Sequence, residues 1–139
     1  MILDTNVVSE PMQALPNQRV MRWLDQVDPM SCFITAISVA ELLAGVERLP
    51  LGKKREKLNS TITVIVNEKF VDRVLSFDLL AAKYFAVAIE KLRRLGLNGM
   101  NVDVLIAAFA LAHIMPVVSR DTRPYEAAGV RVINPWADE

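Results

Sequence analysis

Short apolar runs alternate along this chain with longer segments in which apolar residues recur at helical spacing. The short runs are typical of buried strands, and the longer segments are typical of amphipathic helices. This alternation predicts an α/β fold in which right-handed crossovers join the strands of a parallel sheet. Strands are expected at residues 1–4, 31–35, 74–77, 116–119 and 131–133, and helices at 16–26, 38–49, 53–70, 79–95, 101–113 and 124–128.

The segment 53–70 is the least clear of these elements. Leu58, Ile62 and Ile65 have helical spacing, yet residues 61–66 are rich in β-branched side chains and could also form a strand. We expect a helix. The loop 96–101 is the only expected hinge, and the 139 residues are expected to form one domain over residues 1–139.

Composition and charge describe an ordinary globular chain. Sixteen basic and sixteen acidic residues cancel, so any contact with nucleic acid must depend on a local patch. The single cysteine, Cys32, lies in an apolar run and is expected to be a buried hydrophobe in a reducing compartment. The apolar run 104–112 is shorter than the roughly 20 residues of a membrane span, and no signal peptide is recognised. A cytoplasmic protein without membrane contact is expected.

Four acidic residues lie just after predicted strands or near the start of predicted helices, which is where the active sites of such folds commonly lie. In open parallel sheets, ligands bind beyond the carboxyl ends of the strands, where the strand order reverses. Asp4 ends the first strand and Asp121 follows the fourth, so an order 3-2-1-4-5 would place them face to face. Glu41 and Asp103 fall in the predicted first turns of two helices that begin at the same edge. The path of helix 79–95 between these elements is not derivable from the sequence.

Each acid also has a purely structural explanation. Asp4 and Asp121 could begin turns, Glu41 could complete a capping box with Ser38, and Asp103 could complement a helix dipole. Gathered at one edge, however, four carboxylates repel each other and need either a cation or protons. Because all four are hard oxygen donors, the expected cation is Mg²⁺ or Mn²⁺. His113, near a helix end, is expected to be a dipole partner or a packed histidine.

The blocks around these acids resemble the signature of the PIN domain. The closest likeness is to VapC-type toxins of type II toxin–antitoxin modules, in particular the FitB-like branch. The blocks are Met1-Ile-Leu-Asp4-Thr5-Asn6, Ser38-Val-Ala-Glu41-Leu, Asp103-Val-Leu-Ile-Ala-Ala108 and Ser119-Arg120-Asp121. The opening Asn6-Val-Val-Ser-Glu10-Pro11 and the ending Asn134-Pro135-Trp136 strengthen the likeness, which covers essentially the whole chain.

The resemblance implies a three-layer α/β/α domain, with a parallel sheet of about five strands in the order 3-2-1-4-5, that hydrolyses RNA with Mg²⁺ or Mn²⁺. It places Asp4, Glu41, Asp103 and Asp121 on the family's acidic positions. We hypothesise that Asp4, Asp103 and Asp121 bind metal, while Glu41 holds a metal-bound water or orients the nucleophile.

The resemblance also implies supporting residues and partners. Thr5 and Asn6 support the first acid, and Ser119 takes a place often held by threonine. The implied partners are an RNA substrate, a VapB-like antitoxin whose tail enters the acidic groove, and a second copy in a homodimer. Operator DNA would be bound only indirectly, through the antitoxin.

Basic residues suggest where RNA could lie. Arg120 and Arg123 bracket Asp121 and could contact phosphate, and Arg120 could instead pair with one of the acids. The basic runs at 53–57 and 91–94 are expected to be solvated helix faces, and Trp23 and Trp136 to be core or dimer contacts.

Three other functions share features with this pattern: a receiver-like phosphoacceptor domain, a PIN-like scaffold without activity, and a DNA nuclease. The first lacks the neighbouring acid pair and the late lysine that its chemistry needs, and the second conflicts with the intact quartet.

Overall fold

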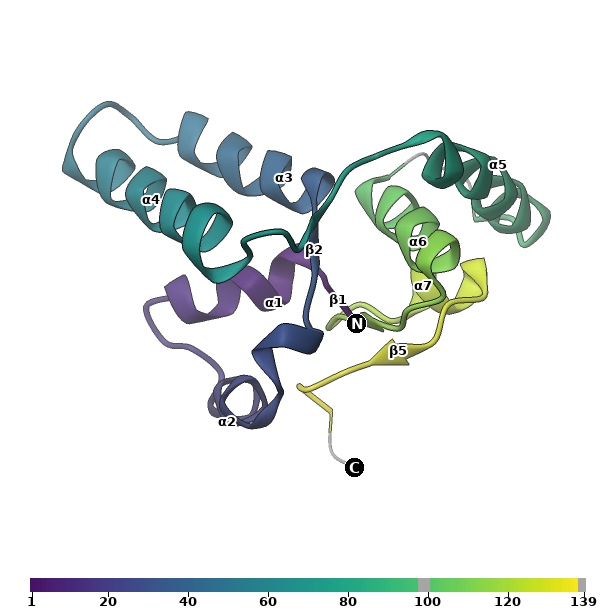
Figure 1. Ribbon diagram of the computed structural model, residues 1–139, viewed down its shortest axis with the longest axis horizontal. Helices are drawn as coiled ribbons and strands as arrows, with labels where there is room; N and C mark the ends of the chain where they lie inside the picture. The colour runs from purple at the N-terminus through teal and green to yellow at the C-terminus, as the bar shows by residue number, and fades with distance from the viewer. Residues whose placement is uncertain (98–100, 138–139) are drawn as a thin grey trace.

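The computed structural model describes residues 1–97 and 101–137 of the chain (Figure 1). The strands are β1 (Ile2–Leu3), β2 (Ile34–Thr35), β3 (Val74–Leu75), β4 (Val117–Val118) and β5 (Val132–Ile133). The α-helices are α1 (Thr5–Ser9), α2 (Gln18–Gln26), α3 (Ala36–Glu47), α4 (Lys53–Val64), α5 (Leu79–Arg94), α6 (Val102–His113) and α7 (Arg123–Ala128). Two 3-10 turns, η1 (Glu10–Met12) and η2 (Pro29–Ser31), and a π-helical turn, η3 (Ile65–Lys69), complete the described elements.

All strand pairs are parallel and follow the predicted order. β4 pairs with β1 on one side and β5 on the other, and β2 pairs with β3. A bridge between Ile2 and Phe33 joins the two groups, with hydrogen bonds from the Leu3 amide to the Phe33 carbonyl (2.8 Å) and from the Phe33 amide to the Met1 carbonyl (2.9 Å). The order is therefore β3-β2-β1-β4-β5, as predicted. β1 and β4 are neighbours at its centre.

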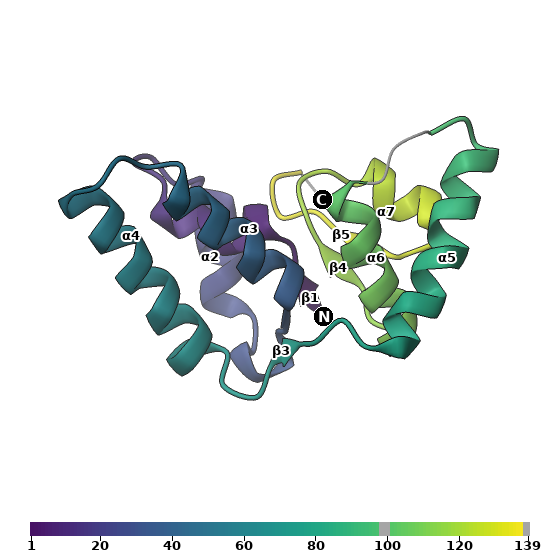
Figure 2. The same ribbon diagram turned by 90° about the horizontal axis from the view of Figure 1, so that it is seen from above.

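The residues of each strand point alternately into two cores. Ile2 and Val117 pack with α5, α6 and α7, whereas Leu3 and Val118 pack with residues of α1–α4. Figure 2 shows α1–α4 on one side of the strands and α5–α7 on the other. This arrangement is the three-layer α/β/α architecture that the resemblance implied.

The strands are shorter than predicted, and helices begin directly after β1 and β2. Asp4 is the N-cap of α1, a helix that the sequence did not predict. Thr35 is the N-cap of α3, and its Oγ1 accepts a hydrogen bond from the Ser38 amide (3.0 Å). Helix α3 thus begins at Ala36 rather than Ser38. The capping box of Ser38 and Glu41 was wrong, and Glu41 lies in the second turn.

The helix expected at 53–70 is confirmed as α4 followed by η3. The strand alternative was wrong, because Ile62 is buried against the core at helical spacing with Leu58 and Ile65. Cys32 is buried and unpaired, as expected. Trp23 and Trp136 pack against the same core. Among the described residues, no helix is both long enough and apolar enough to cross a membrane.

The helical pair α5 and α6 accounts for the path that the sequence left open. The two helices pack side by side, and in Figure 2 α5 rises along the second layer before α6 descends toward β4. The N-terminus of α6 therefore returns to the edge where β1 ends. The predicted hinge at 96–101 includes residues 98–100, which lie outside the described part of the chain.

Candidate active site

Asp4 is the most rigidly held of the four acids. Its side chain is 4% exposed and follows the central strand β1. Asp4 is the N-cap of α1, and one of its carboxylate oxygens, Oδ1, accepts from the Thr5 amide (2.7 Å). The other, Oδ2, accepts from Ser119 Oγ (2.6 Å) and from Asn6 Nδ2 (2.8 Å). The carboxylate is thus fixed by groups from α1 and from the segment that follows β4.

Ser119 and Asp121, which follow the neighbouring strand β4, are linked to this carboxylate by hydrogen bonds through the Ser119 hydroxyl. Ser119 is fully buried, and its Oγ also accepts from the Asp121 amide (3.1 Å) and from Asn6 Nδ2 (3.1 Å). One hydroxyl therefore fixes both Asp4 and the backbone of Asp121. The supporting roles expected of Asn6 and Ser119 agree with these contacts.

Glu41 reaches the site from the second turn of α3. Its Oε1 accepts a hydrogen bond of 2.5 Å from the hydroxyl of Thr5. The hydroxyl of Thr5, the residue after Asp4, thus holds Glu41 beside the first acid. Within the described part of the chain, no hydrogen bond occupies the other oxygen of Glu41, which can therefore face a ligand.

Asp103 lies in the first turn of α6, as predicted. Its pKa is raised to about 6, chiefly by burial and in addition by the charges of Asp4, Asp121 and Glu41. The pKa of Asp4 is also raised by burial, although hydrogen bonds from Ser119 and the Thr5 amide oppose the shift. The four acids from four separate segments therefore act on one another electrostatically, as the strand order predicts.

The sequence did not single out Tyr125. This residue on α7 is completely buried, and its hydroxyl donates to Asp103 Oδ1 at 3.4 Å. Burial and the charges of Asp4 and Asp103 raise the pKa of Tyr125, so its hydroxyl stays protonated and can donate. The only sequence signal was its place four residues after Asp121.

We expect Tyr125→Phe to weaken Mn²⁺ binding about fivefold, because the lost hydrogen bond helps to keep Asp103 ionised and oriented. Stability should change little, since the buried ring is kept. Calorimetric titration with Mn²⁺ would measure the effect. Tyr84→Phe, on the outer face of α5, is the matched control, and equal Mn²⁺ affinity in both variants would refute the role of the Tyr125 hydroxyl.

Among the described residues, Arg120 forms no ion pair with an acid. The alternative that Arg120 pairs with one of the four acids was therefore wrong. The Arg120 guanidinium lies 5.7 Å from the centre of the Trp136 ring. Of the predicted solvated faces, Arg93 and Arg94 form ion pairs with Glu90, and Arg55 forms one with Glu47. His113 is exposed in the last turn of α6, which fits a dipole partner and not a packed histidine.

The donor set fits a hard divalent cation that keeps part of its water shell. Within residues 1–97 and 101–137, no group of three or more histidine, cysteine, aspartate or glutamate side chains could hold a metal ion alone. Mg²⁺ is usually bound by one or two carboxylates together with waters, so it does not need a closed protein cage. The mutual repulsion of the acids is the feature that such an ion would relieve. Direct ligation by Asp4, Asp103 and Asp121 stays a prediction.

Comparison with known proteins identifies the family. The family model described as "PIN domain" matches residues 1–130. The chain belongs to the PIN-domain family. This membership excludes the receiver-like alternative.

Relatives and a solved structure support the more specific resemblance. The chain is 39% identical to Toxin FitB of Neisseria gonorrhoeae over 99% of both chains. It is also 39% identical to VapC ribonuclease Y4jK of Sinorhizobium fredii, over 97% of this chain and 96% of that protein. The structure titled "Structure of FitAB bound to IR36 DNA fragment" superposes with a TM-score of 0.93 at 39% identity, over 99% of this chain and 96% of the other. The likeness of this PIN-domain chain to the VapC and FitB toxins is thus confirmed.

Proposed function

We propose that this PIN-domain protein is the ribonuclease toxin of a type II toxin–antitoxin module, which hydrolyses RNA phosphodiester bonds with Mg²⁺ or Mn²⁺. The observation that carries the proposal is the convergence of Asp4, Glu41, Asp103 and Asp121, whose charges add to the effect of burial in raising the pKa of Asp103 to about 6. The names of the relatives, VapC ribonuclease and Toxin FitB, support the same activity.

The chain's own residues supply positioning. Asp4 is held by Ser119, Asn6 and the Thr5 amide, so it presents its carboxylate in one orientation. Glu41 is fixed through one oxygen by Thr5 and can accept a hydrogen bond from the attacking water through the other. A bound divalent ion would lower the pKa of water and neutralise charge that develops on the phosphate. No histidine base is needed in this scheme.

Cleavage of a mixed RNA pool tests the activity. We expect the purified protein to cut RNA with Mg²⁺ or Mn²⁺ and to lose this activity in excess chelator. Asp4→Asn should be inactive, while Asp25→Asn, an exposed acid on α2, should cut like the unmodified protein. Cutting that survives the chelator, or full activity in Asp4→Asn, would contradict the proposal. A parallel assay on single-stranded DNA separates ribonuclease from DNA nuclease.

The proposed partners are an antitoxin and a second copy of this chain. The similarity to a solved structure of FitAB bound to a DNA fragment supports an antitoxin partner. We expect this antitoxin to be VapB-like, with a tail that enters the acidic groove. In this proposal, operator DNA is contacted through the antitoxin. Expression of this chain alone should arrest growth, and co-expression with the adjacent upstream reading frame should restore it. Unimpaired growth without the upstream frame would count against the toxin.

A further inference from the structure

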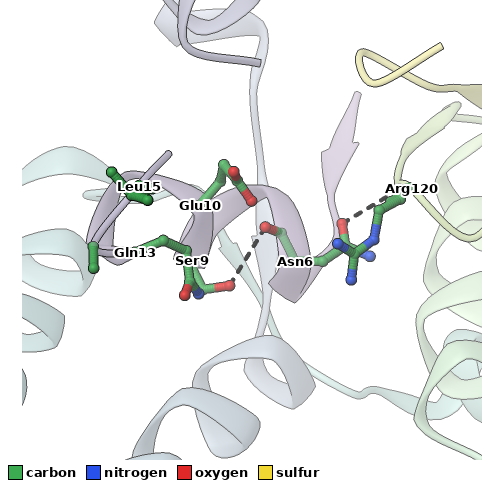
Figure 3. Close-up of a pocket in the computed structure, with 7 residues that line it drawn as sticks. Asn6, Ser9, Glu10, Gln13, Leu15 and Arg120 are labelled. Atoms are coloured by element: carbon green, nitrogen blue, oxygen red, sulfur yellow. Dashed lines mark hydrogen bonds between the residues drawn. The ribbon is translucent and has the colours of Figure 1, made fainter. Parts of the chain in front are cut away.

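An open pocket of about 490 Å³ (Figure 3) is lined in part by Asn6, whose side chain donates a hydrogen bond to Asp4 of the acidic quartet. Its volume falls in the range of roughly 300–1,000 Å³ that is typical of small-molecule and cofactor sites. The walls come from α1, η1, the segment that leads to α2, and the segment after β4. The lining residues are Asn6, Ser9, Glu10, Gln13, Ala14, Leu15 and Arg120.

Asn6 connects this pocket to the acidic site. Its Nδ2 donates to Asp4 Oδ2, and its Oδ1 accepts from the Arg120 amide at 3.4 Å. Arg120 itself stands between Ser119 and Asp121 in the chain. One RNA strand could therefore place a nucleotide in the pocket and the neighbouring phosphate at the quartet.

The two ends of the pocket carry opposite charges. Arg120 is exposed, and none of the ion pairs found among the described residues includes it. Its planar guanidinium can bind a phosphate through two parallel hydrogen bonds. Glu10 is held by the Asn17 amide, which donates to its Oε1 at 2.6 Å, and its second oxygen can accept from a ligand. A phosphate would be attracted to the Arg120 end and repelled from the Glu10 end.

We propose that this pocket binds one unpaired nucleotide next to the cleaved phosphate of the RNA, with its phosphate on Arg120 and its base against Glu10 and Gln13. The proposal rests on the proposed ribonuclease function and adds a determinant of sequence preference. Single-stranded RNA is commonly read in this way, through the hydrogen-bonding edges of splayed-out bases. Leu15, which is 93% exposed at the pocket, offers an apolar surface for the base.

The chemistry of the Glu10 end favours guanine. An ionised carboxylate only accepts hydrogen bonds, so it prefers a base edge with donors. The Watson–Crick edge of guanine carries two adjacent donors, N1–H and the N2 amino group, next to the acceptor O6. The Gln13 amide can donate to that acceptor. Uracil presents a single donor between two acceptors, and these would face the carboxylate unfavourably.

Cleavage and binding of short single-stranded RNAs test the proposal. The RNAs differ at one position beside the cut, which carries guanine, inosine, adenine or uracil. We expect guanine to be preferred over inosine about fivefold in kcat/KM, since inosine lacks the N2 amino group. Glu10→Gln, which keeps an acceptor for the Asn17 amide, should remove this preference. Arg120→Ala should raise KM about tenfold for every RNA, with little change in kcat.

Matched controls separate the pocket from general effects. Gln13→Ala is compared with Gln26→Ala on the exposed end of α2, and Arg120→Ala with Arg131→Ala at the opposite end of the sheet. Binding of the guanine RNA to Asp103→Asn, measured by fluorescence anisotropy in chelator, reports on the pocket without any cleavage. If the unmodified protein cuts RNA but neither preference nor KM responds to these changes, the nucleotide pocket is wrong and the ribonuclease stands. If no RNA is cut yet Arg120 and Glu10 govern binding, the pocket stands and the ribonuclease is wrong.

Discussion

Asp103→Asn is expected to lower RNA cleavage about a hundredfold to a thousandfold and, without divalent ions, to raise the melting temperature at neutral pH. The loss of activity follows from removing a carboxylate that we assign to the metal, whose charge stabilisation is worth several kcal/mol. The gain in stability has a separate cause. Burial and the charges of Asp4, Asp121 and Glu41 oppose the ionised form of Asp103, and asparagine carries no charge.

The same substitution should change the pH dependence of stability. The pKa of Asp103 is about 6 in the folded protein and near 3.8 in the unfolded chain, so the folded state binds the proton more tightly. The unmodified protein without metal should therefore lose stability as the pH rises from about 4 to about 6, and then level off. Asp103→Asn should lack this contribution. The difference between the two proteins should be small near pH 4 and largest above pH 6.

Thermal unfolding with and without Mn²⁺ measures both effects. Mn²⁺ at a hundred times its dissociation constant should stabilise the unmodified protein by about 2.7 kcal/mol, and it should stabilise Asp103→Asn much less. Asp25→Asn serves as the control, because this exposed acid lies on α2. A variant that is less stable than the unmodified protein at pH 7 without metal would contradict the repulsive quartet. Undiminished cleavage would exclude Asp103 from the reaction.

The parts of the site whose positions depend only on the order of the strands could be predicted from the sequence. The short apolar runs predicted a parallel sheet. The order β3-β2-β1-β4-β5, expected as part of the PIN-domain fold, places the ends of β1 and β4 side by side. Asp4 and Asp121 lie at those ends, so their proximity required no knowledge of side-chain contacts. Asp103 also followed, because Asn101 caps α6 as the apolar pattern indicated.

Features that depend on packing were not predictable. The start of α3 was misplaced because Thr35 and Ser38 are both good N-cap residues, and only the structure shows that Thr35 is used. Tyr125 was missed because a buried tyrosine near the C-terminus carries no pattern of its own, whereas its hydroxyl partner, Asp103, lies 22 residues away. The pocket beside Asn6 depends on how the turn η1 and the following segment fold back, which local propensity does not specify.

The hydroxyl of Ser119 gives the second large expected effect, because three groups of the site depend on it. It donates to Asp4 Oδ2 at 2.6 Å and accepts from Asn6 Nδ2 and from the Asp121 amide, each at 3.1 Å. The residue is completely buried, so water cannot readily replace a lost partner. The hydrogen bond from Ser119 also counteracts the rise in the pKa of Asp4. Its removal would leave a buried acid less ionised and less well oriented.

Ser119→Ala should therefore lower kcat/KM for RNA about tenfold to a hundredfold and reduce the free energy of unfolding by about 1–3 kcal/mol. Ser119→Thr separates the two effects, because it keeps the hydroxyl but adds a methyl group to a filled core. Threonine should retain most of the activity even if it costs about as much stability as alanine. Ser60→Ala, on the exposed surface of α4, should leave both quantities unchanged. If activity followed stability across these variants, with threonine as impaired as alanine, Ser119 would be a packing residue rather than the group that orients Asp4.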